Sequence, residues 1–217
     1  MNRTRDRVRW CHILTLSLLV SLAGCNLLVP FAFVGEHKRK VLPEFDKLSN
    51  QRVAILVWMD PATLFDYPYA RVETASYVSD KLRHEMAQRR HETDVVDARD
   101  VEDFLQKNLD ARVDPILVGR RFKADYVVFI EVLEFQIRDP EEPQFLRGRV
   151  EAAVTVHDVQ SEAQAASRYT LTPVKCRYPD DQPVLMDATN SPLVREATYR
   201  LFAEEVARKF YEYSVDL

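Results

Sequence analysis

Two apolar stretches decide the fold of this chain: Val53-Ala54-Ile55-Leu56-Val57-Trp58 and Tyr126-Val127-Val128-Phe129-Ile130. Each is a short uninterrupted apolar run, and Arg52 and Asp125 precede them. Such runs are typical of strands buried on both faces, as in a parallel sheet that carries helices on both sides. We therefore expect an α/β core built around these two strands.

The segment between the two runs has the periodicity of helices. Within 72–90, apolar residues recur three and four positions apart, which predicts a helix with one buried face. Asp114-Pro115 has the composition of a helix start, because proline is tolerated in the first turn. The elements expected here are a helix at 72–90, a strand at 93–97, and helices around 101–105 and 116–122.

The pattern changes after the second run. Residues 150–157 alternate between apolar and polar side chains, as in a strand with one solvent-facing side. A partner strand at 168–174, an irregular loop at 176–192 and an amphipathic helix at 193–213 follow. The fold class is therefore α/β to α+β with a mixed sheet. A parallel β-α-β-α-α-β part precedes an antiparallel β-β meander and a C-terminal helix, in one domain spanning 51–217.

The N-terminus has the three parts of a secretory signal. A basic leader with four arginines precedes an uncharged apolar run at 13–22, and small residues precede Cys25. Leu22-Ala23-Gly24-Cys25 resembles the lipobox of bacterial lipoproteins, and this resemblance implies lipidation of Cys25 and cleavage before it. We expect a signal peptide at 1–24, then the lipidated cysteine and a tether at 25–50. Two or more acyl chains would anchor the protein stably to a membrane.

An uncleaved signal anchor is the alternative. Apolar residues resume after the lipobox, so the stretch 13–34 is long enough to cross a bilayer, and Lys38-Arg39-Lys40 follows it. Gly24, Asn26 and Pro30 weaken a continuous helix there. Both interpretations place the domain in the cell envelope, facing the periplasm. Asn26, in place of a retention-type aspartate, favours the outer membrane.

Composition excludes several classes of protein. The net charge of −4 falls to about −7 once the leader is removed, and a nucleic-acid partner would favour a basic face instead. Cys11 leaves with the signal peptide and Cys25 takes the lipid. Cys176 is then the one remaining cysteine, so no intramolecular disulfide is expected.

No catalytic, cofactor-binding or metal-ligating constellation emerges. The few glycines cannot build a phosphate-cradling loop or a dinucleotide fingerprint. His84 and His91 lie about two helical turns apart, too far to share one ion. Glu131 and Glu134 are three residues apart in one strand, so we expect them on opposite faces, where they cannot act as an acid–base pair.

One phrase carries a family resemblance. The run 118–128, with its Lys123-Ala124-Asp125-Tyr126 corner, and the opening strand 52–56 resemble a group of envelope proteins. The group comprises curli-secretion lipoproteins, lipoprotein activators of penicillin-binding proteins, and the amino-terminal domain of the Tol-system propeller protein. The resemblance implies the fold and an envelope role, mostly without catalysis. Lys123 stands where this group often has glycine.

The loop 60–69, after the first strand, is the candidate functional region. Ligands in such sheets favour the carboxyl ends of parallel strands, and exposed aromatic rings favour protein interfaces. If the loop is extended, Phe65, Tyr67 and Tyr69 share one side and could bind a protein partner; otherwise the rings fold back onto the sheet. We expect a non-catalytic, membrane-anchored adaptor or assembly factor without cofactors. The alternative is an envelope hydrolase whose site lies at these strand ends.

Overall fold

The computed structural model describes residues 38–161 and 168–216, so the predicted signal peptide and Cys25 lie outside the described residues. The chain divides into two compact units, and the larger one is Leu42–Tyr213. In the described part of the smaller unit, β1 (Lys38–Val41) pairs with β9 (Tyr213–Asp216) in a two-stranded sheet that the sequence did not predict. None of the helices described is long and apolar enough to cross a membrane.

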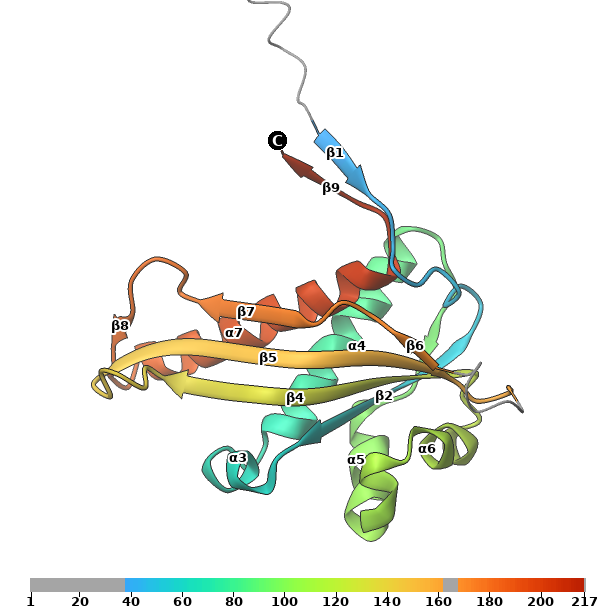
Figure 1. Cartoon of the computed structure of the whole chain (residues 1–217), viewed down its shortest axis with the longest axis horizontal. Coiled ribbons are helices and arrows are strands. Elements are labelled where there is room, and N and C mark those ends of the chain that lie inside the picture. Colours follow the sequence, from blue (N-terminus) through green and yellow to red (C-terminus); the bar gives the residue numbers. More distant parts are fainter. Residues whose placement is uncertain (1–37, 162–167, 217) are drawn as a thin grey trace, which may run out of the picture. The chain divides into compact units, whose positions relative to one another are not determined.

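The larger unit is built on a seven-stranded mixed sheet in the order β3-β2-β4-β5-β6, with β7 and β8 also paired to β5 (Figure 1). Its strands are β2 (Arg52–Met59), β3 (Asp94–Val95), β4 (Tyr126–Arg138), β5 (Phe145–Asp158), β6 (Arg168–Thr170), β7 (Val174–Tyr178) and β8 (Val184–Leu185). β2 is parallel to β3 and β4, whereas every pairing of β5 is antiparallel. The predicted mixed fold class is confirmed.

Helices cover both faces of this sheet, as the two uninterrupted apolar runs predicted (Figure 1). The helical segments are α3 (Pro61–Asp66), α4 (Ala70–Gln88), α5 (Ala98–Lys107), η1 (Leu109–Val113), α6 (Pro115–Phe122), α7 (Asn190–Ala207) and η2 (Arg208–Phe210). Val53, Ile55 and Val57 of β2 pack in the core under α4 and α7, while Ala54 and Leu56 pack under α5 and α6. The crossover through α4 runs in the opposite direction to the crossover through α5 and α6, so right-handed connections place them on opposite faces.

A bulge in β4 changes which side chains share a face. The pairing of β4 with β5 shifts between Val132 and Glu134, and the buried positions change from Val132 to Phe135 across that shift. Glu131 and Glu134 therefore lie on the same face of the sheet, and the prediction of opposite faces is wrong. Strict alternation was assumed, but a bulge inserts one extra residue and inverts the phase of the strand.

The C-terminal third contains more strand than predicted. β7 extends to Tyr178 and β8 occupies Val184–Leu185, so the segment predicted as one irregular loop includes parts of the sheet. The final helix is shorter than 193–213, because α7 ends at Ala207 and η2 and β9 follow. At the contact between α7 and β5, a Cβ on Gly148 would stand 1.8 Å from the Thr198 hydroxyl, so only glycine permits this close approach.

Residues 42–50, here called the strap, belong to the folded unit rather than to the predicted tether. Phe45 and Leu48 are buried, and the backbone N–H groups of Glu44 and Phe45 donate to the Lys209 carbonyl at 2.9 and 3.1 Å. The Lys209 ammonium also pairs with the Glu44 carboxylate at 2.9 Å. The larger unit therefore begins at Leu42, within the stretch 25–50 that was predicted as a tether. Leu42, Phe45 and Leu48 are spaced three apart, but the segment is short and contains Pro43, so no element was predicted there.

The corner between α6 and β4 begins with a residue in the left-handed conformation. Lys123 adopts φ 52° and ψ 38°, and its N–H donates to the carbonyls near the end of α6. The Asp125 carboxylate accepts a hydrogen bond from the Arg52 backbone N–H at 2.8 Å. Asp125 thus joins the start of β4 to the start of β2, which agrees with a structural role for this corner.

Candidate docking site

The predicted aromatic loop is a helix rather than an extended segment. The Asp60 carboxylate accepts from the Ala62 N–H at 2.7 Å and caps α3, which ends just before Tyr67. Phe65 and Tyr69 are 86% and 72% exposed, whereas Tyr67 is half-buried. The three rings therefore do not share one side. Asp60-Pro61 is an N-cap followed by proline, and this signal could have predicted the helix.

Tyr67 begins a ladder of aromatic rings that positions α3. Its ring packs edge-on against Phe135 with centroids 5.1 Å apart, and Phe135 stacks on Tyr199 at 5.6 Å. Tyr199 in turn stacks on Tyr77 at 5.3 Å. Burial and the nearby Glu73 carboxylate raise the pKa of Tyr199, so its hydroxyl remains protonated. The ladder joins α3, β4, α7 and α4, which gives the exposed rings beside Tyr67 a rigid base.

A cleft of about 310 Å³ lies beside this ladder, where α3, the end of β4, the start of β5 and the start of α7 converge. Tyr67 contributes to its wall, and the Tyr67 hydroxyl accepts a hydrogen bond from the Ile137 N–H at 3.3 Å. The lining is mixed, with apolar residues and three charged groups: Asp66, Tyr67, Ile137, Arg138, Leu146, Met186, Ser191, Pro192 and Arg195.

Exposed apolar side chains line the cleft or lie close in sequence to the residues that line it. We call this set the apolar rim, and each member lines the cleft or lies within two residues of a lining residue: Phe65, Tyr69, Leu185, Met186 and Leu193. Single exposed apolar residues are ordinary on protein surfaces, but a group of large ones around one hollow is typical of an interaction site. Only Phe65 and Tyr69 were predicted. Leu185 lies in β8, Met186 directly follows it and Leu193 lies in α7. The sequence alone does not show that these segments approach α3.

Two arginines of the cleft have no partner. Arg138 and Arg195 are exposed at its wall, and neither forms a hydrogen bond or ion pair with any residue that the structure describes. The exposed Asp66 carboxylate, which also lines the cleft, likewise forms no hydrogen bond or ion pair with a described residue. The nearby Asp187 carboxylate, in contrast, accepts from the N–H groups of Thr189 and Asn190 at 2.8 and 2.6 Å. The charge available to a ligand in this cleft is therefore mainly cationic.

In a second hollow, lined by residues of β4, β5 and β7, two of the charged side chains pair with each other. The hollow measures about 530 Å³ and includes Glu151 and Lys175, which form an ion pair at 2.8 Å. Cys176 also lines it, but burial raises the pKa of this thiol to about 12, so it is not a thiolate nucleophile near neutral pH. Glu134 lies here on the same face as Glu131, on an open surface rather than in an enclosed pocket.

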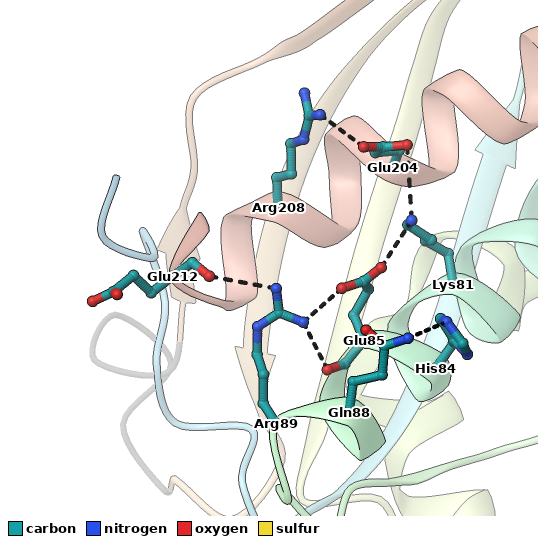
Figure 2. Close-up of polar contacts among 8 residues, drawn as sticks. All are labelled: Lys81, His84, Glu85, Gln88, Arg89, Glu204, Arg208 and Glu212. Carbon is teal, nitrogen blue, oxygen red and sulfur yellow. Dashed lines mark hydrogen bonds and ion pairs between the residues drawn. The ribbon is translucent and has the colours of Figure 1, made fainter. Parts of the chain in front are cut away.

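A polar network links the C-terminal ends of α4 and α7 (Figure 2). The Glu85 carboxylate forms ion pairs with Lys81 at 2.9 Å and with Arg89 at 2.6 Å. Lys81 also pairs with Glu204 at 3.7 Å. Burial opposes ionisation of Glu85, but the hydrogen bonds from the two cations prevail and lower its pKa. Arg89 stacks on the Tyr211 ring at 3.8 Å. The network therefore also holds Tyr211, the residue after η2, against the end of α4.

The histidines considered as metal ligands have separate partners. His84 lies 2.7 Å from the Gln88 amide, and the His91 Nδ1 lies 3.0 Å from the Ser49 hydroxyl. Over 38–161 and 168–216, no three His, Cys, Asp or Glu residues gather as a metal site would require. The cleft and its apolar rim are therefore the candidate site that the geometry favours.

Comparison with known proteins gives structural neighbours only. No family model and no curated protein matches this sequence. The PelC dodecamer from Paraburkholderia phytofirmans is 12% identical, with 79% of this chain and 95% of that chain covered and a TM-score of 0.41. Lipoprotein GNA1162 from Neisseria meningitidis is 14% identical, with coverage of 70% and 98% and a TM-score of 0.36. The hypothetical protein CT253 from Chlamydia trachomatis is also 14% identical, with coverage of 72% and 95% and a TM-score of 0.36. The neighbours thus include a bacterial lipoprotein, but likeness at this level carries no argument about function.

Proposed function

We propose that this chain is a non-catalytic envelope lipoprotein that is tethered to a membrane and binds a protein partner through the cleft and its apolar rim. The observation that carries the proposal is the set of large apolar side chains left exposed around the cleft, with Phe65 and Leu193 more than half exposed. Burying such side chains against a partner contributes roughly 25 cal/mol for each Å² of apolar surface removed from water.

The position of the cleft within the larger unit supports this role. The strap enters the unit at the C-terminal end of α7, where Glu44 pairs with Lys209. Ser191, Pro192 and Arg195 place the cleft at the N-terminal end of the same helix. An 18-residue helix is about 27 Å long. Within the larger unit, the cleft and the strap thus lie at opposite ends of α7.

The anchor is tested by replacing the predicted lipid acceptor. Cys25→Ala removes the thiol that the lipobox resemblance implicates, so metabolic labelling with a fatty acid should be lost and the precursor should keep its leader. Cys176→Ala serves as the control, because it removes the other cysteine of the mature chain and should leave labelling intact. Unchanged labelling of the Cys25 variant would contradict the lipoprotein assignment.

The docking surface is tested by photo-crosslinking in cells that carry the lipidated chain. A photoreactive residue at Leu193 should give a discrete adduct with one partner, whereas the same residue at exposed Arg99 on α5 should not. Arg99 lies on the helices that cover the opposite face of the sheet. Adducts of equal yield at both positions, or no adduct at Leu193, would argue against docking through this end of the molecule.

A further inference from the structure

We infer that the cleft binds a partner segment in which a large apolar side chain lies next to an acidic one, with Arg138 and Arg195 receiving the carboxylate. This inference rests on the proposed docking function and adds the chemistry of the partner. The volume of about 310 Å³ accommodates a few side chains rather than a folded surface, so the occupant is a short segment.

The wall of the cleft supports an apolar anchor. Tyr67, Ile137 and Met186 present apolar surface to it, and the aromatic ladder behind Tyr67 fixes the position of that wall. A preformed apolar wall loses little conformational entropy on binding, which favours affinity from a single inserted side chain.

Charge complementarity supports the acidic neighbour. Arg138 and Arg195 outnumber Asp66 among the charged lining residues, and both guanidinium groups lack a partner in the described chain. Planar guanidinium groups bind carboxylates through paired, charge-assisted hydrogen bonds. A cleft that leaves two of them unpaired beside an apolar wall therefore favours a ligand that combines both features.

The acid belongs to a side chain within a continuous segment rather than to a chain terminus. Residues of the apolar rim adjoin lining residues on two separate segments: Phe65 and Tyr69 lie within two positions of Asp66 or Tyr67, and Leu185 and Leu193 are next to Met186 and Pro192. A segment that passes over the cleft contacts both parts of the rim, whereas a terminus that ends in the cleft contacts one.

The test measures fluorescence anisotropy of synthetic peptides with the full lipidated chain in nanodiscs. The probe is fluorescein-Gly-Ser-Leu-Phe-Glu-Leu-Ser-Gly with an amidated end, and the matched probe has Gln in place of Glu. We expect at least fivefold tighter binding of the Glu peptide, with the preference reduced by added salt. Arg138→Gln and Arg195→Gln should each remove most of the preference at an unchanged melting temperature, while Arg99→Gln should retain it.

Equal affinity for both probes, no binding of either, or a preference that survives both arginine variants would overturn the inference. A free-carboxylate peptide Gly-Ser-Leu-Phe that binds more tightly than the Glu probe would also overturn it, in favour of terminus recognition. The Leu193 photo-adduct separates this failure from failure of the docking function. If the adduct forms while the probes show no acid preference, the partner binds through the rim by other chemistry.

Discussion

Similar side chains are buried at one end of α7 and exposed at the other. At the C-terminal end, Phe45 packs edge-on against Tyr126, Tyr169 and Phe210, with centroids between 5.0 and 6.4 Å apart. At the N-terminal end, Phe65 is almost fully exposed. We call these the closed end and the open end of the larger unit.

The charged groups differ in the same way. The Lys209 ammonium at the closed end is paired with Glu44, and the neighbouring α4–α7 network pairs Glu85 with two cations (Figure 2). Arg138 and Arg195 at the open end have no partner in the described chain. One sequence therefore satisfies its aromatic and charged groups at one end and leaves them available at the other. On the proposed function, the closed end contributes stability and the open end contributes binding.

The largest effect is expected from truncating one phenylalanine at each end. Phe45→Ala should lower the free energy of unfolding by about 3–5 kcal/mol, because it leaves a cavity among three packed rings. Phe65→Ala should change it by less than about 0.5 kcal/mol, since the ring is exposed. Chemical denaturation of both variants measures the contrast. Similar losses at both positions would remove the distinction between the ends.

A smaller, pH-dependent effect is expected at Glu85. Its carboxylate has a lowered pKa in the folded protein, so its stabilisation is present above the unfolded value near 4.5 and is lost as pH falls through the folded value. Glu85→Gln should cost about 1.5–3 kcal/mol at pH 7, the range for hydrogen bonds to charged groups, and much less at pH 3. Melting curves of both proteins across this range give the difference. A constant difference at every pH would mean that the charge is not responsible.

The smallest effect is a gain in stability at Lys123. This residue holds a left-handed conformation that lysine adopts at a cost and glycine adopts freely. Lys123→Gly should stabilise the larger unit by about 0.5–1 kcal/mol, and Lys123→Ala should not, because alanine keeps the Cβ penalty. Equal stability of the glycine and alanine variants would show that the backbone conformation is not the limiting factor. Lys123 forms none of the contacts that define the two ends, so this change calibrates the size of effects unrelated to the comparison.

The sequence predicted the buried centre of the sheet best. The apolar runs in β2 and β4 gave the parallel core and helices on both faces, because a strand with no polar side requires cover on both sides. The alternation of apolar and polar side chains in β5 predicted the antiparallel part of the sheet. The strap, β8 and β9 were missed, since short segments held by long-range contacts leave no period in the sequence. The bulge in β4 was missed for a related reason, as one inserted residue inverts the alternation without changing composition.

The candidate site was predicted only in part. Phe65 and Tyr69 follow a buried strand in the sequence, so their position at the carboxyl end of β2 could be argued from the fold. The opposite wall of the cleft comes from Met186, Pro192 and Arg195, and their approach to α3 depends on the tertiary arrangement of α7 and β8. Tyr67 was grouped with its neighbours because α3 was taken as extended, and the helix turns its ring towards Phe135 instead.

The central claim is that the open end is built for binding rather than for stability. The most direct test combines Phe65→Ser and Tyr69→Ser, leaves Tyr67 in the aromatic ladder, and measures melting temperature and the Leu193 photo-adduct on the same preparation. We expect a melting temperature within about 2 °C of the unsubstituted protein and loss of most of the adduct. A large fall in melting temperature, or an adduct that persists at full yield in a stable variant, would contradict the account.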